Sequence, residues 1–232
     1  MKDINEYLNE VAKLERKQYP ALAHEVHKQH NISKRTLFYI REYGVHSNVP
    51  HTIIKESIKI LLFASILSSL GGLAFENIKE TFISLIPLII LFPVLNDQIG
   101  GYGGVVSSKF SSMLHEGKIE GRRWWKNKEL NMLFAQILIA SIITAVLGAL
   151  FALVISFFSD SLINQNIAYK VFSIAIIDSL ILVTILFFIA IYAGMYFFKK
   201  QEDPNNFLIP ITTSIADFGN MLLLAVLIVL FF

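Results

Sequence analysis

Residues 130–158 read LNMLFAQILIASIITAVLGALFALVISFF and contain no charged side chain. At about 1.5 Å of rise per residue, a helix of this length exceeds the roughly 30 Å hydrocarbon core of a bilayer. Four more long apolar runs lie at 53–75, 82–106, 169–198 and 207–231. Backbone polar groups in lipid must be satisfied within their own segment, and no alternating barrel pattern is present. The sequence therefore predicts an all-α membrane protein with five transmembrane helices.

The composition agrees with a membrane location. The chain is 54% hydrophobic and only 16% charged, whereas a soluble domain is typically about 25% charged. It has no cysteine, which excludes disulfides and thiolate metal sites. No P-loop, nucleophile elbow or His-Glu-x-x-His pattern is present, so we expect no enzymatic activity.

The distribution of Lys and Arg predicts the orientation. Of the 20 basic residues, all except Lys79 and Lys170 fall within 1–59, 109–128 and 199–200. These segments precede the first span, join the second span to the third, and join the fourth to the fifth. By the positive-inside rule, the N-terminus is predicted to be cytosolic and the C-terminus to lie outside. We interpret the basic residues as topology signals and expect no nucleic-acid partner.

Residues 1–50 hold no apolar run long enough to cross a bilayer. Tyr7, Leu8, Val11 and Leu14 recur at helical spacing. We predict a short, helical, cytosolic N-terminal segment over 1–50 and a five-helix ion-permeation domain over 51–232.

Three carboxylates fall deep inside the predicted spans, at Asp97, Asp178 and Asp217. An ionised acid at the bilayer centre costs at least about 2.5–3.5 kcal/mol, so it is a candidate functional group. Counted along the helices, Asp178 and Asp217 lie ~14 and ~15 Å from the span ends, near the midplane. Because no Lys or Arg is predicted at this depth, a cation from solution is the natural partner.

The second span is predicted to be irregular. Pro87 and Pro93 each remove a helix hydrogen bond and favour a kink. Asn96-Asp97-Gln98 follows, and then four glycines, which permit close helix approach or expose carbonyl oxygens to a pore. These glycines are Gly100, Gly101, Gly103 and Gly104.

The fifth span carries hard oxygen ligands. Thr213, Asp217 and Asn220 share one helical face by their spacing of four and seven. Hydroxyl, carboxylate and amide oxygens suit Mg²⁺, Mn²⁺ or Ca²⁺. A dimer about a central axis would place two copies of Asp217 opposite each other.

Two stretches resemble the MgtE-type magnesium transporters and their solute-carrier relatives. Residues 93–119, PVLNDQIGGYGGVVSSKFSSMLHEGKI, resemble the family's proline-led span with its glycine-rich element and Leu-His-x-Gly ending. Residues 203–220, DPNNFLIPITTSIADFGN, resemble its last span. Gly101 stands where Asn is common in the family, and Lys109 replaces the more usual Arg. The chain is also too short to carry the family's large regulatory region.

The resemblance implies a multi-pass cell-membrane homodimer that passes a divalent cation, most simply Mg²⁺, along its axis. It implies that Asp217 is the central ion site and that the second span lines the path. We therefore take as candidate ion-site residues Asp217, Asp97, Asn96, Thr213, Gly100, Gly103 and Asp178.

Three other functions fit parts of the sequence. A proton- or sodium-coupled transporter of another solute could use Asp97 and Asp178 as proton carriers. An intramembrane aspartyl protease would need a Gly-x-Gly-Asp element, but Gly101-Tyr102-Gly103 is followed by Gly104. A structural scaffold would leave Asp217 without a role.

Overall fold

The computed structural model describes residues 49–76, 78–119, 124–159, 164–200 and 203–232, and these residues form helices without any strand. The predicted helical segment over 1–50 therefore falls almost wholly outside the described residues. The helices are α4 (Val49–Glu76), α5 (Lys79–Ser84), α6 (Ile86–His115), the short 3-10 helix η1 (Trp124–Lys126), α7 (Lys128–Phe158), α8 (Gln165–Lys199) and α9 (Pro204–Phe231).

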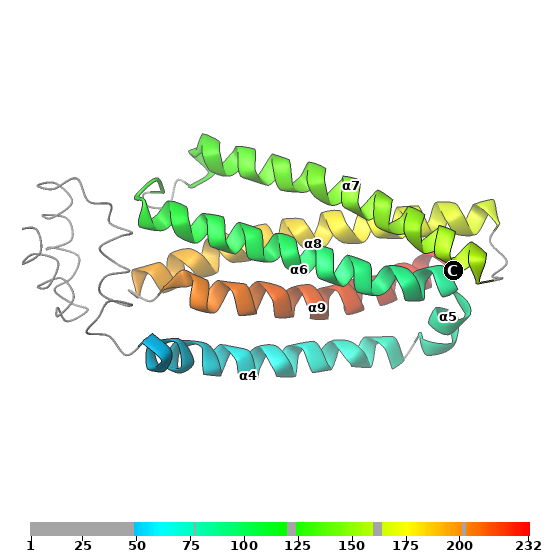
Figure 1. The fold of residues 1–232 in the computed structure, drawn as a ribbon, viewed down its shortest axis with the longest axis horizontal. Coiled ribbons are helices and arrows are strands. Elements are labelled where there is room, and N and C mark those ends of the chain that lie inside the picture. Colours follow the sequence, from blue (N-terminus) through cyan, green and yellow to red (C-terminus); the bar gives the residue numbers. More distant parts are fainter. Residues whose placement is uncertain (1–48, 77, 120–123, 160–163, 201–202) are drawn as a thin grey trace, which may run out of the picture.

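The five long helices alternate in direction (Figure 1). The end of α6, the start of α7, the end of α8 and the start of α9 lie at the end where α4 begins. The described elements at this end carry Lys109, Lys118, Lys126, Lys128, Lys199 and Lys200, whereas Lys79 and Lys170 belong to helix starts at the other end. The alternation is the one that five spans require, and the orientation in the membrane stays a prediction.

Four helices are long and apolar enough to cross a membrane: α4 from Ser57, α7, α8 and α9. The fifth long helix, α6, has 30 residues but is not in this class. Its middle holds Asn96, Asp97 and Gln98, which make it less apolar than the others. The described residues thus confirm an all-helical membrane protein, and the crossing by α6 remains a prediction from the sequence.

The irregularity predicted for the second span does not interrupt the helix, and the kink predicted at Pro93 stays a prediction. The helix α6 runs without interruption from Ile86 to His115, although Pro93 lies inside it. Pro87 lies in its first turn, where the missing N–H has no intrahelical acceptor to lose. Residues 82–84, which were predicted to begin the second span, belong instead to the separate short helix α5.

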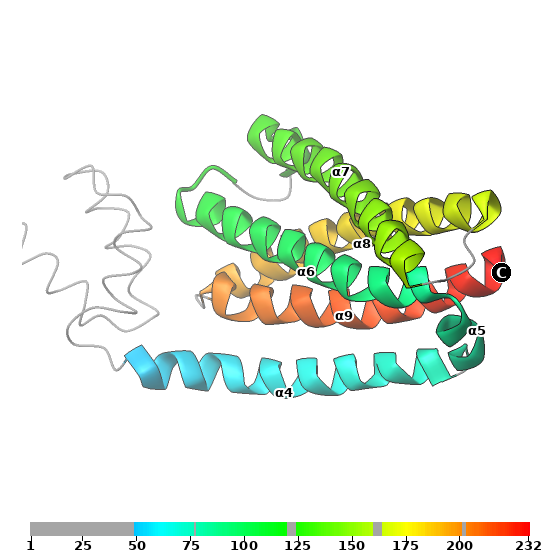
Figure 2. The ribbon, with the colours of Figure 1, turned by 45° about the vertical axis from the view of Figure 1, so that its right-hand side comes forward.

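Helices α6, α7, α8 and α9 pack as a bundle, and α4 packs against α9 at its edge (Figures 1 and 2). Small residues of α7 let the helices approach closely, since Ala145, Ala149 and Ala152 are fully buried. They share a core with Leu91 and Leu95 of α6.

The edge helix α4 buries very little of its surface. Ala64 is buried, whereas Leu62, Phe63 and Ile66 are each more than half exposed. Such apolar exposure is stable only against lipid or another chain.

The end of α6 is a Schellman cap, in which Gly117 has φ +70°. The backbone N–H of Lys118 donates to Met113 O at 3.0 Å, and that of Gly117 donates to Leu114 O at 3.1 Å. Only glycine adopts this φ without strain, which explains the glycine of the Leu-His-x-Gly ending.

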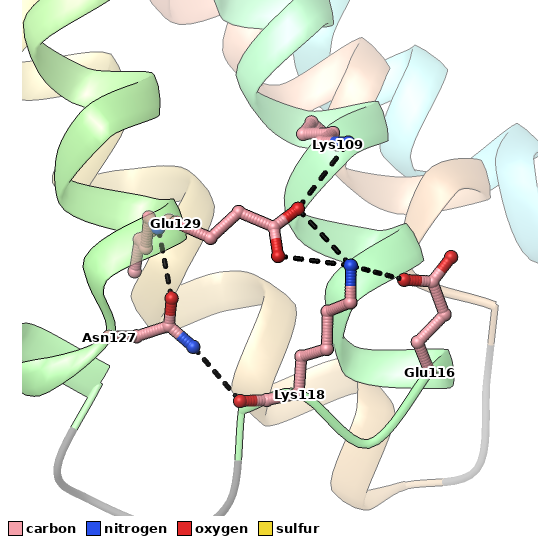
Figure 3. A network of polar contacts seen from close by, with 6 residues as sticks. Lys109, Glu116, Lys118, Asn127 and Glu129 are labelled. Carbon is pink, nitrogen blue, oxygen red and sulfur yellow. Dashed lines mark hydrogen bonds and ion pairs between the residues drawn. The ribbon is translucent and has the colours of Figure 1, made fainter.

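Polar contacts then join the end of α6 to the start of α7 (Figure 3). Lys118 Nζ lies 3.0 Å from Glu129 Oε2 and 3.1 Å from Glu116 Oε2. These hydrogen bonds, above all that to Glu129, raise the pKa of the Lys118 ammonium. Asn127 caps α7 by accepting from Leu130 N at 3.0 Å, and its Nδ2 donates to Lys118 O at 2.9 Å.

Candidate ion site

The three consecutive polar residues of α6 point in three different directions, because successive helical side chains are about 100° apart. Asn96 faces α9, where its Nδ2 donates to Asp217 Oδ1 at 2.7 Å. Gln98 faces α7, where its Nε2 donates to Thr144 O at 3.3 Å. Asp97 points away from the bundle and is exposed. The residues that the sequence groups together are therefore divided between packing contacts and an open face.

Asp217 lies where α4, α6 and α9 meet. Its Oδ1 accepts from Asn96 of α6 at 2.7 Å, and its Oδ2 accepts from Ser68 Oγ of α4 at 3.3 Å. The side chain is half-buried, and within the described part of the chain no basic group forms an ion pair with it. Two neutral donors orient the carboxylate and leave its negative charge uncompensated.

A hydrogen-bonded chain continues from Asn96 into the bundle. Asn220 of α9 is fully buried, and its Nδ2 donates to Asn96 Oδ1 at 3.1 Å. The remaining amide atom of Asn220 lies 3.0 Å from Asp178 Oδ2 on α8. This series of contacts connects Asp178 to Asp217 through two amides.

Asp178 itself has no exposed surface. Its Oδ1 has no hydrogen-bond partner among the residues that the structure describes. It lies inside the bundle, away from the open face that carries Asp97. Its assignment as a direct ion ligand stays a prediction.

Thr213 lies one turn before Asp217 on the same face of α9 and is half-buried. Its Oγ1 donates to Ile209 O at 2.9 Å, which leaves oxygen lone pairs available to a ligand. The neighbouring Thr212 is instead fully buried, and its Oγ1 lies 3.2 Å from Ser107 Oγ of α6.

The four glycines of α6 divide into two pairs. A Cβ at Gly103 would lie 3.1 Å from Thr212 Cβ and 3.2 Å from Leu186 Cδ1, and one at Gly100 would lie 4.0 Å from Ala216 Cβ. Gly103 therefore allows close approach of α6 to its neighbours, whereas a Cβ at Gly100 would make only an ordinary van der Waals contact. A Cβ at Gly101 or Gly104 would meet nothing within 4 Å.

The open face of α6 consists of exposed residues spaced by three or four. They are Pro93, Asp97, Gly101, Val105 and Ser108. We call this set the outer face of α6. It combines a carboxylate with small residues and has no cover within the described residues of this chain.

The described residues of one chain do not supply a complete metal site from acids and histidines. Across the described ranges, no three His, Cys, Asp or Glu side chains are grouped so that they could hold an ion. Hydroxyls, amides, water or a second chain must contribute the remaining oxygens.

Two residues of the polar network were not among the predicted site residues. Asn220 had a signal, since it shares a helical face with Asp217. Ser68 had none, because it lies in an apolar span among other serines, and only the packing of α4 on α9 brings it to Asp217.

The close packing of α4 on α9 gives a test of the site's geometry. A Cβ at Gly71 would lie 3.2 Å from the backbone Cα of Phe218 and 2.8 Å from Met221 Sδ, whereas one at Gly72 would meet nothing within 4 Å. We expect Gly71→Val to move α4 away from α9, withdraw Ser68 from Asp217 and lower transport about tenfold, a loss equivalent to about 1.4 kcal/mol. Gly72→Val is the matched control. Equal transport by the two variants would show that the α4–α9 contact does not support the site.

A bundle of lipid-length helices with a carboxylate in its polar centre defines a multi-pass α-helical membrane protein. The MgtE family, described as a divalent cation transporter, matches residues 92–227, which is more than half of the chain. This chain therefore belongs to the MgtE family of divalent cation transporters.

The chain is also similar to "Solute carrier family 41 member 2" of Gallus gallus. The two are 28% identical over 191 residues, which cover 75% of this chain and 32% of the relative. The chain thus spans about a third of the length of that relative. No solved structure matches the chain.

Proposed function

We propose that this protein passes Mg²⁺, or a chemically similar divalent cation, across the membrane along a path between two copies of the chain. The observation that carries this proposal is Asp217. Its carboxylate lies in the middle of a candidate membrane helix, is oriented by Asn96 and Ser68, and has no basic partner among the described residues. A divalent cation compensates this charge during passage.

The chemistry of the surrounding groups favours Mg²⁺, Mn²⁺ or Ca²⁺ over softer metals. The available ligands are oxygens of Asp217, Asp97 and Thr213, with no cysteine in the chain. Mg²⁺ gives up its waters reluctantly, so a sparse site with one or two carboxylates suits a partly hydrated ion. In this proposal Asn96 positions Asp217, Gly103 allows α6 to lie close enough to α9 for that contact, and Gly100 faces Ala216 of α9.

The outer face of α6 supports a two-copy arrangement. Asp97 there is exposed without a partner among the described residues, and the adjacent Gly101 leaves room for close approach. A second copy related by a two-fold axis would add another Asp97 and another Asp217, which supplies the ligands that one chain lacks. We further propose that the basic end of the bundle faces the cytosol.

The proposal is tested with purified protein in liposomes that contain a Mg²⁺-sensitive dye. We expect Mg²⁺ entry down its own gradient, competition by Mn²⁺, and no requirement for a sodium or pH gradient. Mg²⁺ entry no faster than in protein-free liposomes contradicts the proposal. Flux that depends on a sodium or pH gradient supports the coupled-transporter alternative instead.

The absence of native cysteine makes the two-copy arrangement directly testable. We expect Gly101→Cys to form a disulfide-linked dimer on oxidation, because a bond requires Cα atoms within about 7 Å and the residue is on the proposed interface. Ile143→Cys is the control, since Ile143 lies on α7 and is 55% exposed. Cross-linking of both variants to the same extent indicates random collision, and cross-linking of Ile143→Cys alone places the interface on α7.

A further inference from the structure

The buried series of polar contacts from Asp178 to Asp217 has a fixed order of donors and acceptors. From α8 to α9 to α6 and back to α9, the successive distances are 3.0 Å for Asp178–Asn220, 3.1 Å for Asn220–Asn96 and 2.7 Å for Asn96–Asp217. A primary amide donates only from nitrogen and accepts only at oxygen. The role of each group in the chain therefore determines the role of the next.

The ionised end sets this direction. A carboxylate at Asp217 only accepts, so Asn96 presents its nitrogen to it and its oxygen to Asn220. Asn220 then presents its nitrogen to Asn96 and its oxygen to Asp178. The series is completed only if Asp178 donates a hydroxyl hydrogen to Asn220.

In the placement above, Asn220 Nδ2 also lies 3.2 Å from the Asn96 backbone N, which is a second donor. The opposite placement of the Asn220 amide removes this contact between donors but brings two acceptors together. Asn220 then donates to Asp178 Oδ2 at 3.0 Å, and its oxygen accepts from the Asn96 backbone N at 3.2 Å. However, that oxygen also lies 3.1 Å from Asn96 Oδ1, and two facing acceptors repel each other. Turning the Asn96 amide as well would aim its oxygen at the Asp217 carboxylate.

The burial of Asp178 agrees with a hydroxyl-bearing side chain. Asp178 and Asn220 are both 0% exposed, and no basic side chain in the described ranges pairs with Asp178. A buried charge without a counter-ion is far more costly than a neutral group that donates one hydrogen bond.

We propose that Asp178 is a positioning residue for ion passage, which donates to Asn220 and thereby keeps the Asn96 amide donating to Asp217. This inference rests on the proposed role of Asp217 as the ion site. It assigns Asp178 no contact with the ion and no transfer of a proton. The chain of amides holds Oδ1 of Asp217, so Oδ2, with its longer 3.3 Å contact to Ser68, is the oxygen that turns toward a cation.

Two variants at position 178 distinguish the need for a hydrogen-bond donor to Asn220 from the need for a negative charge. Asn at position 178 still offers an N–H to the Asn220 oxygen, so we expect Asp178→Asn to keep Mg²⁺ flux within about threefold of the unmodified protein. Val offers no donor and leaves the Asn220 oxygen unsatisfied, so we expect Asp178→Val to lower flux about tenfold or more. Ser179→Ala is the matched control, because it removes a neighbouring buried hydroxyl whose hydrogen bond within the described part of the chain is a long one, to Ser141 O at 3.4 Å.

A spectroscopic measurement tests the hydroxyl directly. We expect the infrared spectrum of the protein at neutral pH to contain the C=O stretch of a protonated carboxylic acid, and Asp178→Asn to lack it. Absence of this band from the unmodified protein overturns the proposal, whatever the flux of the variants.

The outcomes distinguish this inference from the proposed function. If Asp217→Asn abolishes flux and Asp178→Asn does so as well, the ion site stands and the positioning role is wrong, because the charge of Asp178 is then required. If Mg²⁺ flux through the unmodified protein depends on a pH gradient and flux through Asp178→Asn does not, Asp178 is a proton carrier and the inference is also overturned. If Asp178→Val does not fold, the comparison of the two Asn variants and the infrared band still decide. If Asp217→Asn transports normally, the proposed function itself fails.

Discussion

We expect Mg²⁺ transport by the reconstituted protein to fall roughly 100-fold or more when Asp217 is replaced by Asn. The substitution keeps the shape of the side chain and an oxygen that accepts from Asn96, and its new amide nitrogen can donate to Ser68 Oγ, but it removes the negative charge. Loss of a charged partner at a partly buried site costs about 3 kcal/mol, which is roughly a 100-fold change. Initial rates of dye-reported Mg²⁺ entry measure this effect over a range of Mg²⁺ concentrations.

Glu129→Gln is the matched control for this experiment. It also neutralises a carboxylate, but Glu129 belongs to the contacts with Lys118 and Lys109 at the end of the bundle. We expect its flux to stay within about twofold, since exposed ion pairs contribute little. The thermal stability of Asp217→Asn in detergent should match that of the unmodified protein. Normal transport by folded Asp217→Asn would show that Asp217 is not the central ion site.

The second large effect is expected at Gly103. A Cβ there meets Thr212 and Leu186 at 3.1 and 3.2 Å, and the further methyl groups of Val have no space. Overpacking of this kind typically costs about 1–3 kcal/mol. Because α6 carries Asn96 on the same side, we expect Gly103→Val to lower both the thermal stability in detergent and the Mg²⁺ flux.

Gly104→Val is the control for this stability measurement, since a Cβ there meets nothing within 4 Å. We expect it to unfold at the same temperature as the unmodified protein. A lower unfolding temperature of Gly104→Val would show that the glycines of α6 do not divide into packed and open positions. If Gly103→Val keeps full stability and still blocks flux, Gly103 lines the ion path and does not serve helix packing.

Several features of the site followed from chemistry that is local in the sequence. An acid in a long apolar run needs a compensating partner, so Asp217 and Asp97 could be selected without coordinates. The spacing of Thr213, Asp217 and Asn220 along one helix likewise predicted a shared face. Contacts between helices could not be predicted in this way, because nothing in the apolar span of α4 marks Ser68 as the residue that reaches Asp217.

The sequence by itself determined the class of this protein: apolar runs of lipid length dictate helices, and alternating basic connections dictate their up-and-down order. Only the tertiary structure decided how its polar residues divide. Asn96 turns to Asp217, Asp97 turns outward, Gly103 packs while Gly101 stays open, and Asp178 is buried behind Asn220. The physical reason is that hydropathy depends on residue type alone, whereas the partner of a side chain depends on how each helix is rotated and packed against its neighbours.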